Sequence, residues 1–147
     1  MKLFIFSLLV FTFLESYSQT CNESNSILSV RKRKVGKTEY VIFTLKKPVK
    51  AQIEVDDDQP PFIEDASGET IKVRGCKFKR VKFGNVIWTC QSKMISATTN
   101  LIKQVKIIGQ FEGQIVYIIG YSCEAKSIVH YEYDDGNKRK IVMRIKG

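Results

Sequence analysis

The chain has 147 residues, 44% of them hydrophobic and 27% charged, and carries a formal net charge of +9. This length suits one ordinary domain with a core of its own and argues against several domains within these residues. The positive charge favours anionic partners such as envelope polymers, acidic lipid headgroups or nucleic acid, without choosing among them.

The first 18 residues have the pattern of a secretory signal peptide. Lys2 precedes an uncharged apolar run over residues 3–14, and small residues follow before the expected cleavage after Ser18. The apolar run is shorter than the roughly 20 residues that a membrane-spanning helix needs. We therefore expect no transmembrane span and export to the periplasm, the cell surface or the extracellular space. A membrane anchor is the alternative.

Cleavage at this point leaves a polar lead-in over residues 19–26 and one domain over residues 27–147. Cys21 lies close to the new N-terminus, so lipid attachment to this cysteine is a second targeting hypothesis. The residues before Cys21 (Ser-Gln-Thr) match the sequence required for lipid attachment poorly. The unmodified, exported chain is therefore preferred.

Four cysteines in an exported chain predict two disulfides. We expect Cys76 to pair with Cys90, because the two flank one predicted hairpin, and by elimination Cys21 to pair with Cys123. A zinc site is the alternative. It is disfavoured because the cysteines lack the close spacing of structural zinc ligands and the chain has one histidine.

The first half of the domain reads as short strands. A strand over residues 27–30 leads into a basic turn, and apolar alternation predicts strands over 39–45 and 49–55. The acidic segment 56–65 is expected to be a loop that balances nearby lysines, with calcium binding as the alternative. The basic turn after residue 30 is either solvated or an anion-binding patch. Its candidate anion-binding residues are Arg31, Lys32, Arg33 and Lys34.

A second basic segment follows in a predicted hairpin, with arms over 78–83 and 86–91 and a Gly-Asn turn. Phe78 falls out of phase with the other apolar residues of its arm, so we expect a β-bulge near Arg80. The first arm supplies further anion-binding candidates, which are Lys77, Lys79, Arg80 and Lys82.

The Ser/Thr-rich stretch 92–100 shows no period and is expected to be a loop. The stretch 105–120 then has two runs of β-branched and aromatic residues and predicts the central hairpin of the domain. Further strands are expected over 127–133 and 141–145. Short strands at regular spacing, with no helix outside the signal, predict an all-β fold, an antiparallel β-sandwich of about seven to nine strands.

The residues offer little for catalysis, so we expect no enzyme, no metal and no cofactor. His130 lies beside Glu132 on the polar face of a predicted strand, which is typical of a surface histidine. Free thiols are not expected after export. Basic and aromatic residues on a β-surface would suit single-stranded nucleic acid, but an exported chain rarely meets it, so nucleic acid is not an expected partner.

Several short motifs occur in an order that resembles the AMIN-like domain, a relative of the AMIN domain found in exported bacterial envelope proteins. Val-Ile-Phe-Thr-Leu at 41–45 is followed by Lys-Pro-Val at 47–49, and Ser67-Gly68 precedes a strand from Gly75. Val-Lys-Ile-Ile-Gly-Gln-Phe-Glu-Gly at 105–113 resembles the family's "strand–Gly–x–Phe-Glu-Gly" core. The chain departs from the family in its four cysteines and in lacking the prolines before the last strand.

The resemblance implies a β-sandwich that acts as a binding or localisation module of the cell envelope. Phe111 is expected to be a core anchor, and Gly109 and Gly113 to occupy restrictive backbone positions. Glu112 is either a buried carboxylate bonded to the backbone or one wall of a ligand groove. The expected partner is an anionic envelope polymer such as peptidoglycan, or an envelope protein. A secreted protein–protein interaction or inhibitor-like domain is the alternative, and the oligomeric state is left open.

Overall fold

A computed structural model describes residues 24–86, 89–90, 94–96 and 100–147, and it confirms the predicted antiparallel β-sandwich. The expected signal peptide and Cys21 lie outside the described residues. Eleven strands form within this part of the chain, and three of them have only two or three residues. The strands are β1 (Ile27–Val35), β2 (Thr38–Lys46), β3 (Gln52–Asp58), β4 (Phe62–Ile63), β5 (Thr70–Ile71), β6 (Lys77–Gly84), β7 (Met94–Ser96), β8 (Ile102–Phe111), β9 (Gln114–Tyr121), β10 (Ser127–Asp135) and β11 (Lys138–Lys146).

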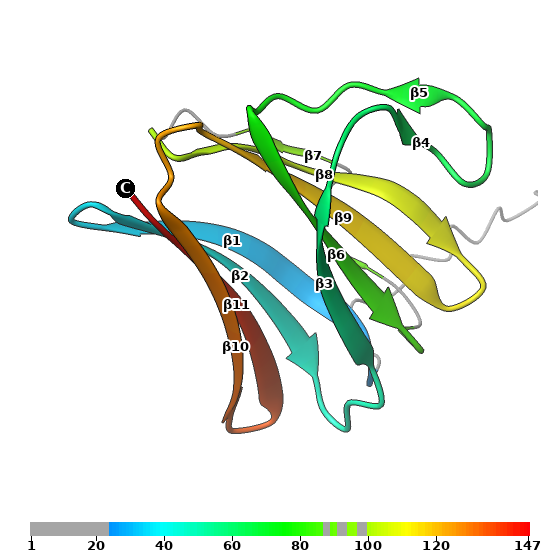
Figure 1. Ribbon diagram of the computed structural model, residues 1–147. Helices are drawn as coiled ribbons and strands as arrows, with labels where there is room; N and C mark the ends of the chain where they lie inside the picture. Colours follow the sequence, from blue (N-terminus) through cyan, green and yellow to red (C-terminus); the bar gives the residue numbers. More distant parts are fainter. Residues whose placement is uncertain (1–23, 87–88, 91–93, 97–99) are drawn as a thin grey trace, which may run out of the picture.

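Two sheets face each other in the sandwich (Figure 1). The four-stranded sheet has the order β1-β2-β11-β10, and the five-stranded sheet has the order β3-β6-β9-β8-β7. All of their strand pairs are antiparallel. The chain therefore builds half of the first sheet, then the whole second sheet, and returns with β10 and β11 to complete the first.

The main core lies between the sheets and has an aromatic centre. Phe43 of β2 meets Phe83 of β6 and Tyr117 of β9, with ring centroids 5.1 and 5.0 Å away. The Tyr117 hydroxyl lies 3.0 Å from the Thr89 hydroxyl, and burial raises the pKa of Tyr117 to about 12. These contacts join the two sheets, because Phe43 belongs to one and Phe83 and Tyr117 belong to the other.

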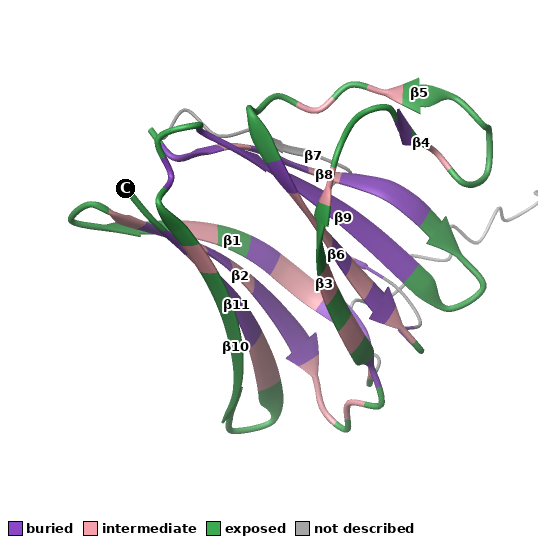
Figure 2. Cartoon of the chain, in the orientation of Figure 1, coloured by how far each residue is buried: buried purple, intermediate pink, exposed green. Residues whose placement is uncertain are grey.

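A second apolar cluster lies on the outer face of the five-stranded sheet. Phe62 of β4 packs edge-on against Phe78 of β6 at 5.0 Å, next to Ile118 of β9. The β4–β5 ribbon thus covers this face, and β9 is buried on both sides (Figure 2). The predicted bulge near Arg80 is wrong, since β6 pairs without a register shift with both neighbours. Phe78 is out of phase because it belongs to the second cluster.

The predicted central hairpin is confirmed as β8 and β9, but its connection is shorter than expected. Glu112 and Gly113 alone form the turn, with φ of 48° and 76°. Two positive φ angles are typical of a two-residue hairpin turn and favour glycine at the second position. Gly109 lies within β8, where an added Cβ would come 2.6 Å from Asp65 Oδ2. Gly113 therefore occupies a restrictive position, as expected, whereas the obstacle at Gly109 is the end of an exposed side chain that can move aside.

The roles expected for Phe111 and for a buried Glu112 are wrong. Phe111 ends β8 beside the turn and is 62% exposed, and Glu112 is exposed in the turn itself. The turn lies beyond the edge of the core, so neither side chain reaches it.

Phe111→Ala is accordingly expected to change the free energy of unfolding by less than about 0.5 kcal/mol. The buried comparison Ile118→Val should lower it by about 1 kcal/mol although it removes only one methyl group. Chemical denaturation of both variants measures the difference. A larger loss for Phe111→Ala than for Ile118→Val would contradict the exposed position of Phe111.

Three further local predictions are wrong. Residues 31–34 are not a turn, because β1 continues to Val35 against β2 and the chain reverses at Gly36 and Lys37. The described residues of the predicted arm 86–91, which are 86, 89 and 90, do not pair with β6, whose two neighbours are β3 and β9; residues 87, 88 and 91 lie outside the described part. The stretch 92–100 contains β7, which pairs with β8; residues 92–93 and 97–99 lie outside the described part.

The predicted disulfide pairing is wrong as well. Cys76 is bonded to Cys123, with their Cα atoms 5.2 Å apart. Cys76 precedes β6 and Cys123 follows β9, and the antiparallel register that pairs Lys77 with Tyr121 brings the two cysteines to the same end of the sheet. Cys90 is also disulfide-bonded.

Candidate binding surface

The outer face of the four-stranded sheet, turned away from the core, gathers aromatic side chains. Tyr40 of β2 and Tyr131 and Tyr133 of β10 alternate with core-facing positions and lie on this side. The two β10 rings stack with centroids 6.3 Å apart and are 42% and 44% exposed. We call the lining of the shallow depression here, about 300 Å³ in volume, the tyrosine face; it comprises Arg33, Val35, Tyr40, Ile42, Tyr131, Tyr133 and Val142.

Cations border the tyrosine face. Arg31 and Arg33 are exposed on β1, and within the described part of the chain neither lies within ion-pair distance of an acidic side chain. Lys140 pairs with Asp135, keeping the pKa of that carboxyl below its usual range, and its Nζ lies 5.7 Å from the centre of the Tyr133 ring. The surface therefore combines exposed rings with two guanidinium groups whose charge is not neutralised by a neighbour.

The other predicted anion-binding segment is arranged differently. β6 runs beside the acidic β3, and three cations form ion pairs across the strands: Lys79 with Asp57 (2.9 Å), Arg80 with Asp58 (2.7 Å) and Lys82 with Glu54 (3.4 Å). Lys77 donates a hydrogen bond to the Ala125 carbonyl. Asp57 and Asp58, which belong to the acidic segment expected to be a loop, thus lie in β3 and balance Lys79 and Arg80.

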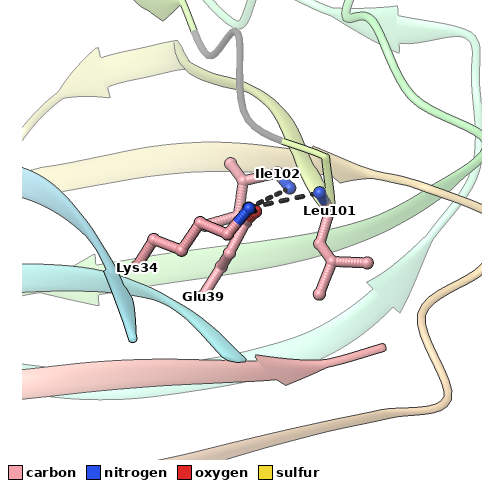
Figure 3. A network of polar contacts seen from close by, with 4 residues as sticks. All are labelled: Lys34, Glu39, Leu101 and Ile102. Atoms are coloured by element: carbon pink, nitrogen blue, oxygen red, sulfur yellow. Dashed lines mark hydrogen bonds and ion pairs between the residues drawn. The ribbon is translucent and has the colours of Figure 1, made fainter. Parts of the chain in front are cut away.

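The remaining basic candidates of β1 point to the opposite side of the sheet from Arg31 and Arg33. Lys34 Nζ lies 4.0 Å from Oε1 of Glu39, which is 1% exposed (Figure 3). Burial lowers the pKa of Lys32, while the nearby Glu39 carboxylate opposes this shift. These two lysines therefore lie on the side of the sheet that carries Glu39, and the four predicted residues divide into an outward pair and an inward pair.

Glu39 connects the two sheets through backbone hydrogen bonds. Its Oε2 accepts bonds from the amides of Leu101 (3.2 Å) and Ile102 (2.8 Å), where β8 begins (Figure 3). Glu39 belongs to β2, so one carboxylate satisfies two buried donors of the opposite sheet. We interpret Glu39 as a structural clamp, because its carboxylate is buried and bonds the backbone of the opposite sheet.

The residues with potential for catalysis or metal binding lie away from the tyrosine face. His130 is exposed on the side of β10 opposite the tyrosines, and the neighbouring Glu132 forms an ion pair with Arg139. No group of three or more histidine, cysteine or acidic side chains is placed to hold a metal ion within the described ranges. These ranges also contain no helix long and apolar enough to cross a membrane.

Alternation along the strand places Tyr131 and Tyr133 on one face, opposite His130 and Glu132, but does not show that this face is a surface. The signal lay in β11, where Ile141, Met143 and Ile145 face the core. Tyr131 pairs with Val142 and Tyr133 with Lys140, positions that alternate with these core residues, so both tyrosines point outward. Using this signal requires the β10–β11 register, which is set by the two-residue turn Gly136-Asn137 between Asp135 and Lys138.

No protein-family model matches the chain, and no curated protein or solved structure matches it either. The AMIN-like resemblance therefore stays a prediction from short motifs. Two of its residues, Phe111 and Glu112, are now placed at an exposed turn.

Proposed function

We propose that the protein is an exported, non-catalytic binding module of the cell envelope, and that the tyrosine face with Arg31 holds an anionic envelope component such as peptidoglycan. The observation that carries the proposal is the pair of exposed, stacked tyrosines beside two arginines without acidic partners among the described residues. The signal-peptide pattern and the resemblance to AMIN-like domains support export and a location in the cell envelope.

The chemistry of this surface suits such a ligand. A guanidinium binds a carboxylate or phosphate through two parallel hydrogen bonds, and an exposed arginine has no internal partner to give up first. The face of a tyrosine ring is a rigid surface against which the apolar side of a sugar ring can pack. The hydroxyl at the edge of the ring remains available for hydrogen bonds. Arg33 and Tyr133 line adjoining depressions of about 380 and 300 Å³, so both kinds of contact are available to one extended polymer.

Sedimentation with purified peptidoglycan sacculi tests the proposal. We expect the exported protein to sediment with sacculi at low salt and the double variant Arg31→Glu/Arg33→Glu to lose at least about tenfold in affinity, since two attractive charges become repulsive. The matched control Lys50→Glu/Lys72→Glu changes the net charge equally at exposed lysines away from this face and should bind like the wild type. Equal loss in both variants would reduce the effect to net charge and contradict a defined site.

A protein partner is the second candidate, favoured by the exposed Val129, Tyr131 and Tyr133 on one strand. Tyrosine and arginine are enriched at the energetic centres of protein interfaces. Salt separates the candidates, because electrostatic polymer binding should fade towards physiological ionic strength and a packed interface should persist. Absence of sedimentation at low salt would remove the polymer and leave the protein partner.

A further inference from the structure

β10 is an edge strand that is exposed over nearly its whole length (Figure 2). Of its nine residues only Ile128 is partly buried, and the rest are exposed on both sides of the strand. Its one neighbour among the described strands is β11. The backbone donors and acceptors along its outer edge therefore face solvent, as a template on which another strand can form.

The edge has few of the features that prevent strand pairing. Its sequence, SIVHYEYDD, contains no proline, glycine or lysine, and its register with β11 shows no bulge from Ser127 to Asp135. Natural edge strands are commonly protected by such features. The acidic residues near its C-terminal end are the main deterrent to pairing.

We propose that two copies of this protein pair through β10 in antiparallel orientation, with Tyr131 opposite Tyr131 about a twofold axis. In this register His130 of each copy lies opposite Glu132 of the other, and Val129 lies opposite Tyr133. Apolar side chains thus meet apolar side chains on one face, and a histidine meets a carboxylate twice on the other. Arg139 engages Oε2 of Glu132, so the second oxygen can accept an imidazole N–H.

The charge pattern selects this register. A shift by one residue would turn the tyrosines of one copy to the opposite face. A shift by two residues places either Glu132 opposite Glu132 or His130 opposite His130. Antiparallel pairing also separates Asp134 and Asp135 of the two copies, whereas parallel pairing would bring them together. The strand is therefore complementary to itself in one arrangement.

The second edge of this sheet is a less suitable partner. At the start of β1, Ile27 already bridges Thr89, and its carbonyl accepts a bond from the Cys90 amide. The acidic residues of β10 that would attract the basic β1 are held by Lys47, Arg139 and Lys140. Head-to-tail pairing of β10 with β1 is the competing arrangement.

The paired arrangement joins two four-stranded sheets into one, and the twofold axis keeps both tyrosine faces on the same side. This inference goes beyond the proposed function and does not depend on it, because the dimer forms without a ligand. The contact is small, so we expect a weak dimer that dissociates on dilution.

Sedimentation velocity over a concentration series of the exported, disulfide-bonded protein tests the dimer without ligand. His130→Glu replaces two favourable cross-strand pairs by two repulsive ones and should raise the dimer dissociation constant at least about tenfold. His130→Lys, which places an ammonium opposite Glu132, should lower the constant severalfold. His130 is exposed, and unchanged thermal unfolding midpoints confirm that both variants fold.

The β1 variant Arg31→Glu/Arg33→Glu completes the test. It should dimerise like the wild type even where it fails to bind sacculi. The dimer proposal and the proposed binding of sacculi can therefore be contradicted independently. A wild type that stays monomeric at every concentration would overturn the proposal. Equal weakening by glutamate and lysine at position 130 would overturn this register, and loss of association in the β1 variant would establish head-to-tail pairing instead.

Discussion

Glu39→Ala is expected to lower the free energy of unfolding by about 3–5 kcal/mol. The carboxylate of Glu39 is 1% exposed and accepts hydrogen bonds from two amides at the start of β8. Alanine would leave the Leu101 and Ile102 N–H groups buried without this acceptor, and each such loss costs about 1–3 kcal/mol. Lys34 would also lose its nearest carboxylate.

Two comparisons define what is lost. Glu39→Gln keeps an oxygen that can accept the amide bonds and should cost about 1 kcal/mol. Glu54→Ala removes an exposed strand carboxylate that pairs with Lys82 and should cost less than about 1 kcal/mol. Guanidinium denaturation of the three variants gives the values. Similar losses for Glu39→Ala and Glu54→Ala would show that Glu39 does not connect the sheets.

Gly120→Ala adds only one methyl group but is expected to lower the free energy of unfolding by about 3 kcal/mol. The segment containing Arg74 crosses β9 so closely that an added Cβ would lie 2.0 Å from the Arg74 carbonyl oxygen. The obstacle is backbone, so the segment would have to lift. Lifting would pull Val73 from the second apolar cluster and break the bond from the Arg74 amide to Gln104.

Gly84→Ala is the matched control for this substitution. Gly84 also lies in a strand of the five-stranded sheet, but an added Cβ would meet its nearest neighbour at 3.8 Å, an ordinary contact. Its effect should stay within about 1 kcal/mol of zero. Thermal unfolding in parallel measures both, and a Gly120→Ala variant as stable as Gly84→Ala would exclude the close crossing.

The parts of the fold that could be predicted were those with local signals. Alternation predicted β2 and β11, and two apolar runs on either side of a Gly-bracketed segment predicted the central hairpin. The errors have a common cause in contacts between distant segments. β6 was assigned a hairpin with the next residues, but its neighbours β3 and β9 are separated from it in sequence, and a local turn at Gly84-Asn85 does not reveal them.

The candidate site depended on the same distant contacts. Arg31 and Arg33 were predicted as anion ligands; Arg33 lies on the tyrosine face and Arg31 beside it, whereas Lys79, Arg80 and Lys82 are engaged by β3. The sequence alone does not distinguish cations that have an acidic partner from cations that have none. The pairing of a basic strand with an acidic one becomes visible only once strand order is known. The Cys76–Cys123 bond likewise follows from the β6–β9 register, which spacing along the chain does not supply.

The β4–β5 ribbon makes the two outer faces of the sandwich different, because it covers one of them. Its cover makes the outer side of the five-stranded sheet behave as interior, so polar replacements at Val116 or Ile118 should be rejected there. The opposite sheet keeps an open exterior and can accumulate changes in specificity without disturbing folding. Diversification among relatives of this protein should therefore concentrate on one side of the molecule, and a laboratory library that varies binding belongs on that side alone.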